Sequence, residues 1–196
     1  MRLAIIGSGD YADWSTVLST YDYIIAADGG ADYCARWHST PHKIIGDGDS
    51  STISFTVDRD QHTTDLQKAL RYATTVLTAD SSIDLFCVTS QNRTDHTLAA
   101  ITTLLYWPNV QAIYTPYQIL YAPQPAVHLP QASGTAVSIV PYTATATVSL
   151  AGLQWSGTVT LDSMRSGISN RITQSPASIT VTSGRVIVSL DHTYGN

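Results

Sequence analysis

Short apolar runs alternate with longer amphipathic segments over the first 122 residues of the chain. The apolar runs predict strands at residues 2–6, 23–27, 44–45, 83–89, about 110–115 and 118–122. The segments between them predict helices that end near residues 19, 37 and 78 and before Pro108. Strands that are continuously apolar and alternate with helices indicate an α/β domain over residues 1–122. Its sheet is expected to be largely parallel, with helices on both faces.

The helix expected at residues 64–78 has the clearest local signals. Thr64 and Gln67 have the spacing of a capping box, in which each side chain binds the main chain of the other residue. The apolar positions fall on one helical face: Leu66, Ala69, Leu70, Ala73, Val76 and Leu77. The pattern therefore predicts an amphipathic helix that packs on the sheet.

The pattern changes after residue 122. Pro123, Pro125 and Pro130 interrupt the chain, and no helical period follows. Apolar residues then alternate with Thr, Ser or Gln at residues 136–140, 146–151, 158–161, 178–182 and 185–190. Turns are expected at Gly134, Gly152, Gly157, Gly167 and Gly184. Residues 123–196 are thus predicted to form a small antiparallel β domain, which at this size should pack on the first domain or on a second copy.

The amino-acid composition and net charge limit the class of protein and the kinds of binding partner to be expected. Hydrophobic residues make up 43% of the chain and charged residues 13%, which excludes a disordered chain. The net charge is −5, and Lys43 and Lys68 are the two lysines, so a nucleic acid or an anionic membrane is not expected as partner. No apolar stretch has the length of a membrane span, and residues 1–9 are too short for a signal-peptide core. Cys34 and Cys87 lack metal-ligand spacing, so we expect buried thiols in a cytoplasmic protein.

The segment from Lys43 to Ser51 carries the first candidate chemistry. Ile44 and Ile45 lead into Gly46 and then into Asp47 and Asp49, so both acids follow the end of a predicted strand. Open α/β sheets bind ligands at this edge. Two neighbouring carboxylates repel each other unless a cation offsets their charge, and Mg²⁺ is the natural partner of such oxygen ligands. The alternative for an isolated Asp-Gly-Asp is a solvated turn.

Other charged residues recur at strand ends and helix starts. They are Asp28, Asp47, Asp49, Asp65, Arg93, Asp95 and His96. Asp65 and Asp95 taken singly fit ordinary helix-terminus chemistry. Together, however, the set predicts one crevice in which carboxylates hold a metal ion, and the ion and Arg93 hold phosphates, without a P-loop lysine.

The segment Gly7–Ala12 supports a rival hypothesis. It fits the G-x-G-x-x-A pattern after a strand, and Asp28 follows about twenty residues later, as in an NAD-dependent oxidoreductase. Against this, the α/β part is short for two mononucleotide halves, and Asp47 and Asp49 have no role in hydride transfer.

Six short motifs resemble those of the thiamine pyrophosphokinase family. They are Ala27–Ala31, Gly46–Ser50, Asp60–Asp65, Arg93–His96, Gly152–Trp155 and Ser169–Asn170. This resemblance implies transfer of diphosphate from ATP to the thiamine hydroxyl, with AMP leaving. It also implies an α/β domain followed by a β-sandwich, in a homodimer whose sites lie between the first domain of one subunit and the sandwich of the other. A diphosphokinase of the same fold that acts on a pterin or another heterocyclic alcohol stays open as the alternative.

The resemblance also assigns roles to residues. Mg²⁺ is expected at Asp47, Asp49 and Asp65, with Asp28 close to the ion or its waters. Arg93 is expected to hold phosphate, Asp95 to contact the substrate or orient Arg93, and Trp155 to stack on the pyrimidine ring. The expected substrate-binding residues are Asp28, Gly29, Gln61, Thr64, His96, Trp155, Ser169 and Asn170. Three places depart from the family pattern: Gly48 replaces a Phe, His62 replaces an acid, and Gln91–Asn92 stands where glycine is usual before the Arg.

Overall fold

A computed structural model describes residues 1–192 of the chain. The described residues divide into two compact units, residues 1–116 and 117–192. The division precedes the boundary expected after residue 122, because strand β6 (Gln118–Tyr121) pairs antiparallel with β13 (Val186–Asp191) of the second unit. No helix in the described residues is long and apolar enough to cross a membrane.

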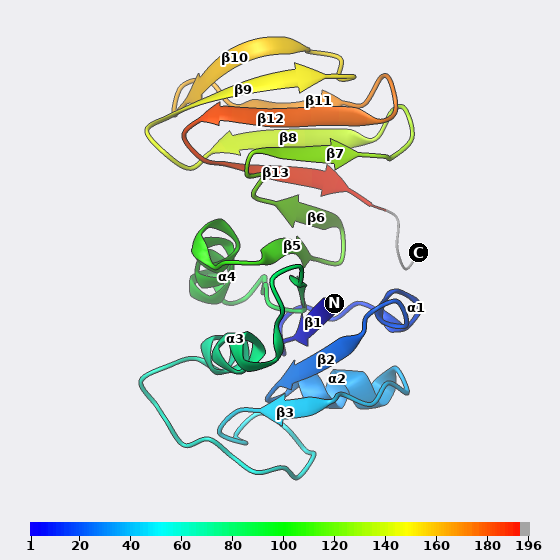
Figure 1. Cartoon of the computed structure of the whole chain (residues 1–196), viewed down its shortest axis with the longest axis vertical. Helices are drawn as coiled ribbons and strands as arrows, with labels where there is room; N and C mark the ends of the chain where they lie inside the picture. The colour runs from blue at the N-terminus through cyan, green and yellow to red at the C-terminus, as the bar shows by residue number, and fades with distance from the viewer. Residues whose placement is uncertain (193–196) are drawn as a thin grey trace. The chain divides into compact units, whose positions relative to one another are not determined.

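The first unit is an α/β unit with a five-stranded parallel sheet (Figure 1). Its elements are β1 (Arg2–Ile6), α1 (Ser15–Leu18), β2 (Tyr23–Ala27), α2 (Gly30–Arg36), β3 (Lys43–Ile45), α3 (Asp65–Val76), β4 (Ser82–Phe86), α4 (Thr94–Tyr106) and β5 (Val110–Tyr114). The strand order is β5-β4-β1-β2-β3, and every neighbouring pair in it is parallel. The carboxyl ends of β2 and β3 therefore lie next to each other.

Alternation along each strand divides the core of this unit between the two faces of the sheet. Ala4 and Ile6 pack with Trp14 and with residues of α1 and α2 in one apolar cluster. Ile5 points to the opposite face because neighbouring strand residues alternate, and α3 contacts β1, β2 and β3. Helices thus cover both faces, as predicted.

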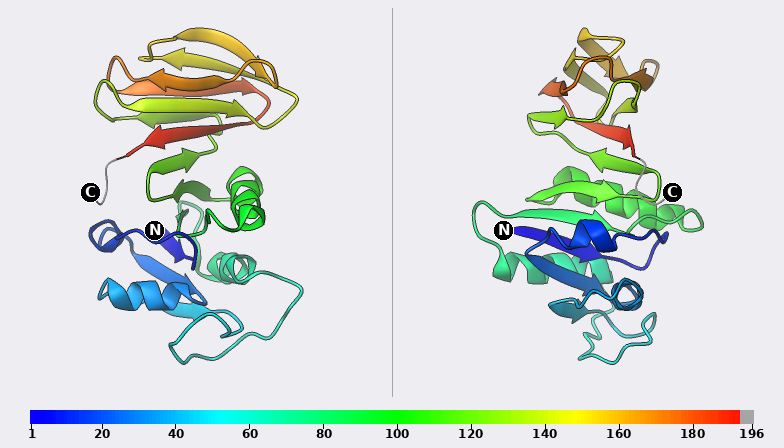
Figure 2. Two further views of the ribbon diagram at one scale, coloured as in Figure 1. Left: turned by 180° about the vertical axis from the view of Figure 1, so that it is seen from behind. Right: turned by 90° about the vertical axis from the view of Figure 1, so that its right-hand side faces the viewer.

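The second unit is a sandwich of two antiparallel sheets (Figure 2). Its remaining strands are β7 (Ala126–Leu129), β8 (Ala136–Pro141), β9 (Thr145–Ala151), β10 (Gly157–Asp162), β11 (Gly167–Arg171) and β12 (Ala177–Ser183). Within this unit, one layer has the strand order β11-β8-β13-β6 and the other β10-β9-β12-β7. Side chains from both sheets share one buried apolar cluster, which includes Ile139 of β8, Val148 of β9 and Ile179 of β12.

The structure corrects several expectations. The sheet expected over residues 1–122 is parallel in β1 to β5, but β6 pairs antiparallel with β13, so the expectation of a largely parallel sheet holds only in part. Helix α1 is four residues long, shorter than expected. Strand β4 ends at Phe86, not at residue 89, because Cys87 adopts a φ of 53°, which no strand residue has. Strands β7 and β11 were not predicted.

Candidate active site

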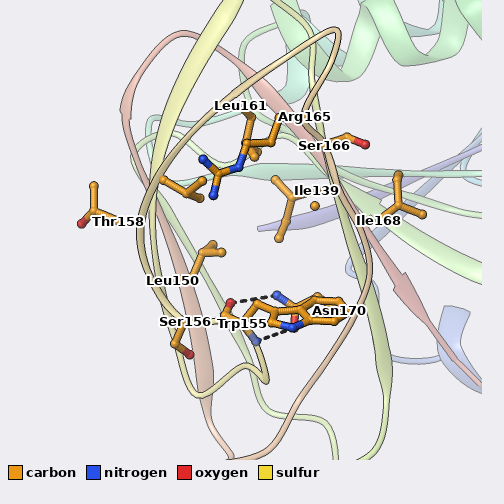
Figure 3. Close-up of a pocket in the computed structure, with 12 residues that line it drawn as sticks. Ile139, Leu150, Trp155, Ser156, Thr158, Leu161, Arg165, Ser166, Ile168 and Asn170 are labelled. Atoms are coloured by element: carbon orange, nitrogen blue, oxygen red, sulfur yellow. Dashed lines mark hydrogen bonds between the residues drawn. The ribbon is translucent and has the colours of Figure 1, made fainter.

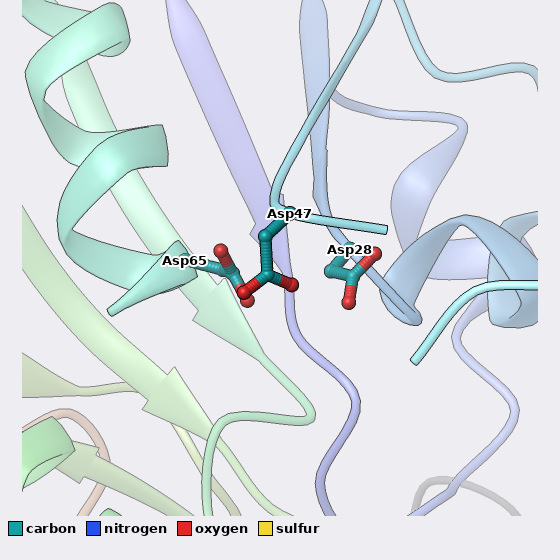
Figure 4. A group of neighbouring side chains, drawn as sticks. All are labelled: Asp28, Asp47 and Asp65. Carbon is teal, nitrogen blue, oxygen red and sulfur yellow. The ribbon is translucent and has the colours of Figure 1, made fainter. Parts of the chain in front are cut away.

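Three carboxylates meet at the carboxyl end of the parallel sheet (Figure 4). Asp28 directly follows β2, Asp47 lies two residues after the end of β3, and Asp65 is the first residue of α3. Each offers one oxygen atom, and these atoms all lie within 4.8 Å of one another. Three acids at this distance, at the edge where open α/β sheets bind ligands, are suited to hold a divalent cation.

Asp28 is the buried member of this acid cluster, with 2% of its surface exposed. Its Oδ2 accepts a hydrogen bond from the main-chain N–H of Ser50 at 2.9 Å. Its Oδ1 is buried and has no hydrogen-bond partner in the described residues. Burial raises the pKa of Asp28, and the charges of Asp65 and Asp49 raise it further, while the Ser50 N–H acts in the opposite direction. A bound cation would satisfy the free oxygen.

Glycine allows the loop after β3 to approach this carboxylate. A Cβ atom on Gly46 would lie 2.6 Å from the Cβ of Asp28, so only glycine fits between β2 and β3 here. Gly48 has a φ of 80°, and a Cβ there would lie 2.8 Å from Val57. The Gly48 departure from the family pattern thus matches a local backbone that requires glycine.

Asp47 and Asp49 have different surroundings although they are two residues apart. Asp47 Oδ2 accepts a hydrogen bond from Gln61 Nε2 at 2.7 Å, and this contact is the main reason that the pKa of Asp47 is lowered. Asp49 is exposed, and its Oδ1 accepts a hydrogen bond from the Ser50 hydroxyl at 2.7 Å. The structure therefore groups Asp28 with Asp47 and Asp65, and places Asp49 beside this cluster.

The predicted capping box positions Asp65. Thr64 Oγ1 accepts the N–H of Gln67 at 3.2 Å, and Gln67 Oε1 accepts the N–H of Thr64 at 3.0 Å, as the sequence predicts. Asp65 Oδ1 forms an ion pair with the buried Lys68 at 3.0 Å. Lys68 was not among the predicted site residues, although its position three residues after Asp65 is a pairing signal.

Arg93 and Asp95 form a two-pronged ion pair at the start of α4. Arg93 Nε and Nη2 donate to the two carboxylate oxygens of Asp95 at 3.1 and 2.9 Å. The Arg93 hydrogen bonds lower the pKa of Asp95 to about 2. Both side chains are exposed, as is His96 in the first turn of α4. Both oxygens of the Asp95 carboxylate thus contact the guanidinium of Arg93.

A pocket in the second unit contains the predicted aromatic residue (Figure 3). Its volume is about 290 Å³, and Trp155 and Asn170 lie on its wall. Trp155 is 57% exposed, whereas Asn170 is buried. Ser169 is exposed beside the pocket and has a φ of 60°, and its N–H donates to Ser138 Oγ at 3.0 Å. Aliphatic side chains complete much of the wall: Ile139, Leu150, Val159, Leu161 and Ile168.

Comparisons with known proteins connect these features to one family. The model of the thiamin pyrophosphokinase catalytic domain matches residues 14–115. The chain belongs to the thiamin pyrophosphokinase family. The vitamin B1 binding domain of the same family matches residues 126–186. Members are ATP-dependent diphosphotransferases that act on thiamine, and this is the function of the chain.

Solved structures share the whole fold at low sequence identity. Thiamine pyrophosphokinase from Bacillus subtilis has a TM-score of 0.85 and 18% identity, over 98% of this chain and 100% of that one. Thiamin pyrophosphokinase from Geobacillus thermodenitrificans has a TM-score of 0.82 and 19% identity, over 99% of both chains. The Candida albicans enzyme has a TM-score of 0.80 and 14% identity, over 98% of this chain and 90% of that one. A comparison with curated proteins found no match.

The rival dinucleotide pattern has a different role in this thiamin pyrophosphokinase fold. The N–H groups of Gly7 and Gly9 donate to the carbonyl oxygens of Phe86 and Cys87 at 2.8 and 2.6 Å. These donors are used within the protein, and α1 begins only at Ser15. The glycine loop therefore does not open a helix that could hold a pyrophosphate, as the dinucleotide motif requires.

Proposed function

We propose that the acid cluster of Asp28, Asp47 and Asp65 holds Mg²⁺ for the transfer of diphosphate from ATP to thiamine. The observation that carries this proposal is the free Oδ1 of Asp28, which is buried beside two further carboxylates. A buried carboxylate oxygen without a donor is unfavourable unless a ligand completes it. The donor set consists of oxygen atoms only, as Mg²⁺ prefers.

Asp49 belongs to the proposed set as a neighbouring charge. Its carboxylate adds to the negative potential felt at Asp28. When bound, Mg²⁺ supplies positive charge against the phosphate oxygens of ATP. The protein residues then align the two substrates, which is the larger part of catalysis in phosphoryl transfer.

Arg93 is the proposed phosphate ligand. Its guanidinium is exposed and is already oriented by Asp95. Arginine binds phosphate oxygens through paired N–H groups, so an oriented guanidinium loses little freedom on binding. Gly29, Gln61, Thr64 and His96 are the further nucleotide-side residues of the proposal. Gln61 already donates a hydrogen bond to Asp47, and Thr64 caps the helix that begins at Asp65.

The pocket at Trp155 is the proposed thiamine site. The exposed indole of Trp155 offers a flat face to the pyrimidine ring. The second motif of this unit, Ser169 and Asn170, lies on β11, and Asn170 lines the same pocket. The match of the vitamin B1 binding domain to residues 126–186 supports thiamine over a pterin as acceptor.

We further propose a cytoplasmic homodimer in which each complete site combines the acid cluster of one subunit with the Trp155 pocket of the other. The exposed apolar side chains around this pocket support an interface: Trp155, Met164 and Ile168 are 57%, 92% and 51% exposed. Cys34 and Cys87 are buried free thiols, in agreement with a reducing compartment.

The metal assignment is tested by the Mg²⁺ dependence of AMP release. Asp28→Asn removes the buried charge while it keeps the shape of the side chain, so half-maximal activity should need about tenfold more Mg²⁺ or greater. Asp80→Asn, at an exposed aspartate in the turn after α3, is the matched control and should match wild type. An unchanged Mg²⁺ dependence in Asp28→Asn would remove Asp28 from the metal site.

A further inference from the structure

Lys68 is a buried lysine on α3 whose ammonium group has two partners. The residue is 3% exposed. Its Nζ donates to Asp65 Oδ1 at 3.0 Å and to the main-chain carbonyl oxygen of Asp58 at 3.1 Å. Lysine is almost never buried to this extent unless it is paired. The ammonium group therefore links the first turn of α3 to the loop at Asp58, and no hydrogen bond of a helix or strand connects these two segments.

A further hydrogen bond connects Asp58 to the loop that carries Asp47. The N–H of Asp58 donates to the carbonyl oxygen of Gly46 at 2.7 Å, and Gly46 directly precedes Asp47. Residues 46–64 contain no helix or strand, so the position of Asp47 relative to α3 depends on such contacts. Lys68 thus connects the first turn of α3, which carries Asp65, to the loop that carries Asp47.

Lys68 also makes the one ion pair that the acid cluster has within residues 1–192. Its charge lowers the pKa of Asp47, after the larger effect of Gln61. A role through charge alone and a role through position have opposite consequences for a metal ion. Removing a positive charge makes the cluster more negative and should tighten cation binding. Losing the alignment of the carboxylates should weaken it.

We propose that Lys68 is a positioning residue that fixes the separation of the Asp47 and Asp65 carboxylates for the divalent ion. This inference rests on the proposed metal site. The alignment effect exceeds the charge effect, because the ammonium group bridges two segments and its charge is already balanced by Asp65. Loss of Lys68 therefore weakens Mg²⁺ binding although the cluster becomes more negative.

The test is a Mg²⁺ titration of the full chain without nucleotide or thiamine. The readout is the increase in the midpoint temperature of unfolding as Mg²⁺ is added. Lys68→Met keeps the length of the side chain but removes its charge and donors. This variant should need about tenfold more Mg²⁺ than wild type to reach half of the maximal increase in the unfolding temperature. Lys68→Arg keeps the charge and donors and should recover part of the loss. Lys43→Met removes the same charge from an exposed position on β3 and is the matched control, expected to behave as wild type.

Activity assays at saturating Mg²⁺ give a second readout. In Lys68→Met, kcat for AMP release should fall about tenfold or more, while the KM for thiamine stays within twofold of wild type. If Lys68→Met does not fold, Lys68→Gln keeps an N–H donor group without a buried charge and takes its place in both measurements.

The outcomes separate this inference from the proposed function. Mg²⁺ binding in Lys68→Met that is as tight as in wild type, or tighter, overturns the positioning role and leaves the metal site intact. A wild-type protein that Mg²⁺ does not stabilise overturns the metal site, and the positioning role with it.

Discussion

The side chain of Asn170 binds the main chain of Trp155 in both directions. Its Oδ1 accepts the N–H of Trp155 at 3.1 Å, and its Nδ2 donates to the carbonyl oxygen of Trp155 at 2.9 Å. Asn170 is 1% exposed, so this contact is protected from water. The buried amide therefore fixes the main chain of the residue whose indole lies half-exposed on the pocket wall.

This arrangement predicts a selective effect of Trp155→Ala. Loss of an aromatic stacking partner should cost about 1 kcal/mol or somewhat more, which corresponds to a several-fold to tenfold higher KM for thiamine. The KM for ATP should change less than twofold. Trp155→Phe retains an aromatic ring, so its KM for thiamine should lie between those of wild type and Trp155→Ala. Equal changes in both KM values would show that Trp155 is not part of the thiamine site.

The shared-site proposal makes a prediction for mixed subunits. Asp47→Asn should lower turnover by about a hundredfold or more, because it removes charge that faces the phosphates. Mixing Asp47→Asn chains with Trp155→Ala chains gives dimers in which one of the two sites has both residues intact. Activity at low thiamine should then exceed the sum of the separate proteins.

The control for this experiment is the formation of mixed dimers, measured with two different tags. If mixed dimers form and activity does not rise above the sum, each site is built within one chain. The assignment of Asp47 would survive that result.

Thr64→Ala tests whether the capping box stabilises the helix that carries Asp65. Loss of the Thr64 hydroxyl leaves the N–H of Gln67 without its partner. We expect a decrease of about 1 kcal/mol in the free energy of unfolding, measured by urea denaturation. Thr64→Ser keeps the hydroxyl and is the matched control. No difference between the two variants would show that the hydroxyl does not stabilise α3.

Local signals were sufficient for much of the fold. The run at residues 23–27 coincides with β2, and the Thr64–Gln67 spacing gave both the start and the cap of α3. Strand β11 was not predicted for two reasons. It is short and polar, and its pairing with β8 shifts register between Gly167 and Asn170. A period-two pattern cannot persist across such an irregularity.

The candidate site shows a similar limit. Acids at strand ends and helix starts were expected to converge, and Asp28, Asp47 and Asp65 do so. Asp28, Asp47 and Asp65 form the cluster and Asp49 lies beside it, an arrangement that depends on the irregular loop after β3 and that spacing does not reveal. The role of Lys68 was equally hidden, because one of its partners is a main-chain oxygen in an irregular loop ten residues away.

Diphosphate transfer is tested by the products formed from MgATP with and without thiamine. We expect thiamine-dependent release of AMP together with an equal amount of thiamine diphosphate, and no thiamine-dependent ADP. Asp47→Asn should reduce this release by about a hundredfold or more, whereas Asp80→Asn should leave it unchanged. Release of ADP in place of AMP, or AMP release that does not depend on thiamine, would contradict the assignment of diphosphate transfer to this chain.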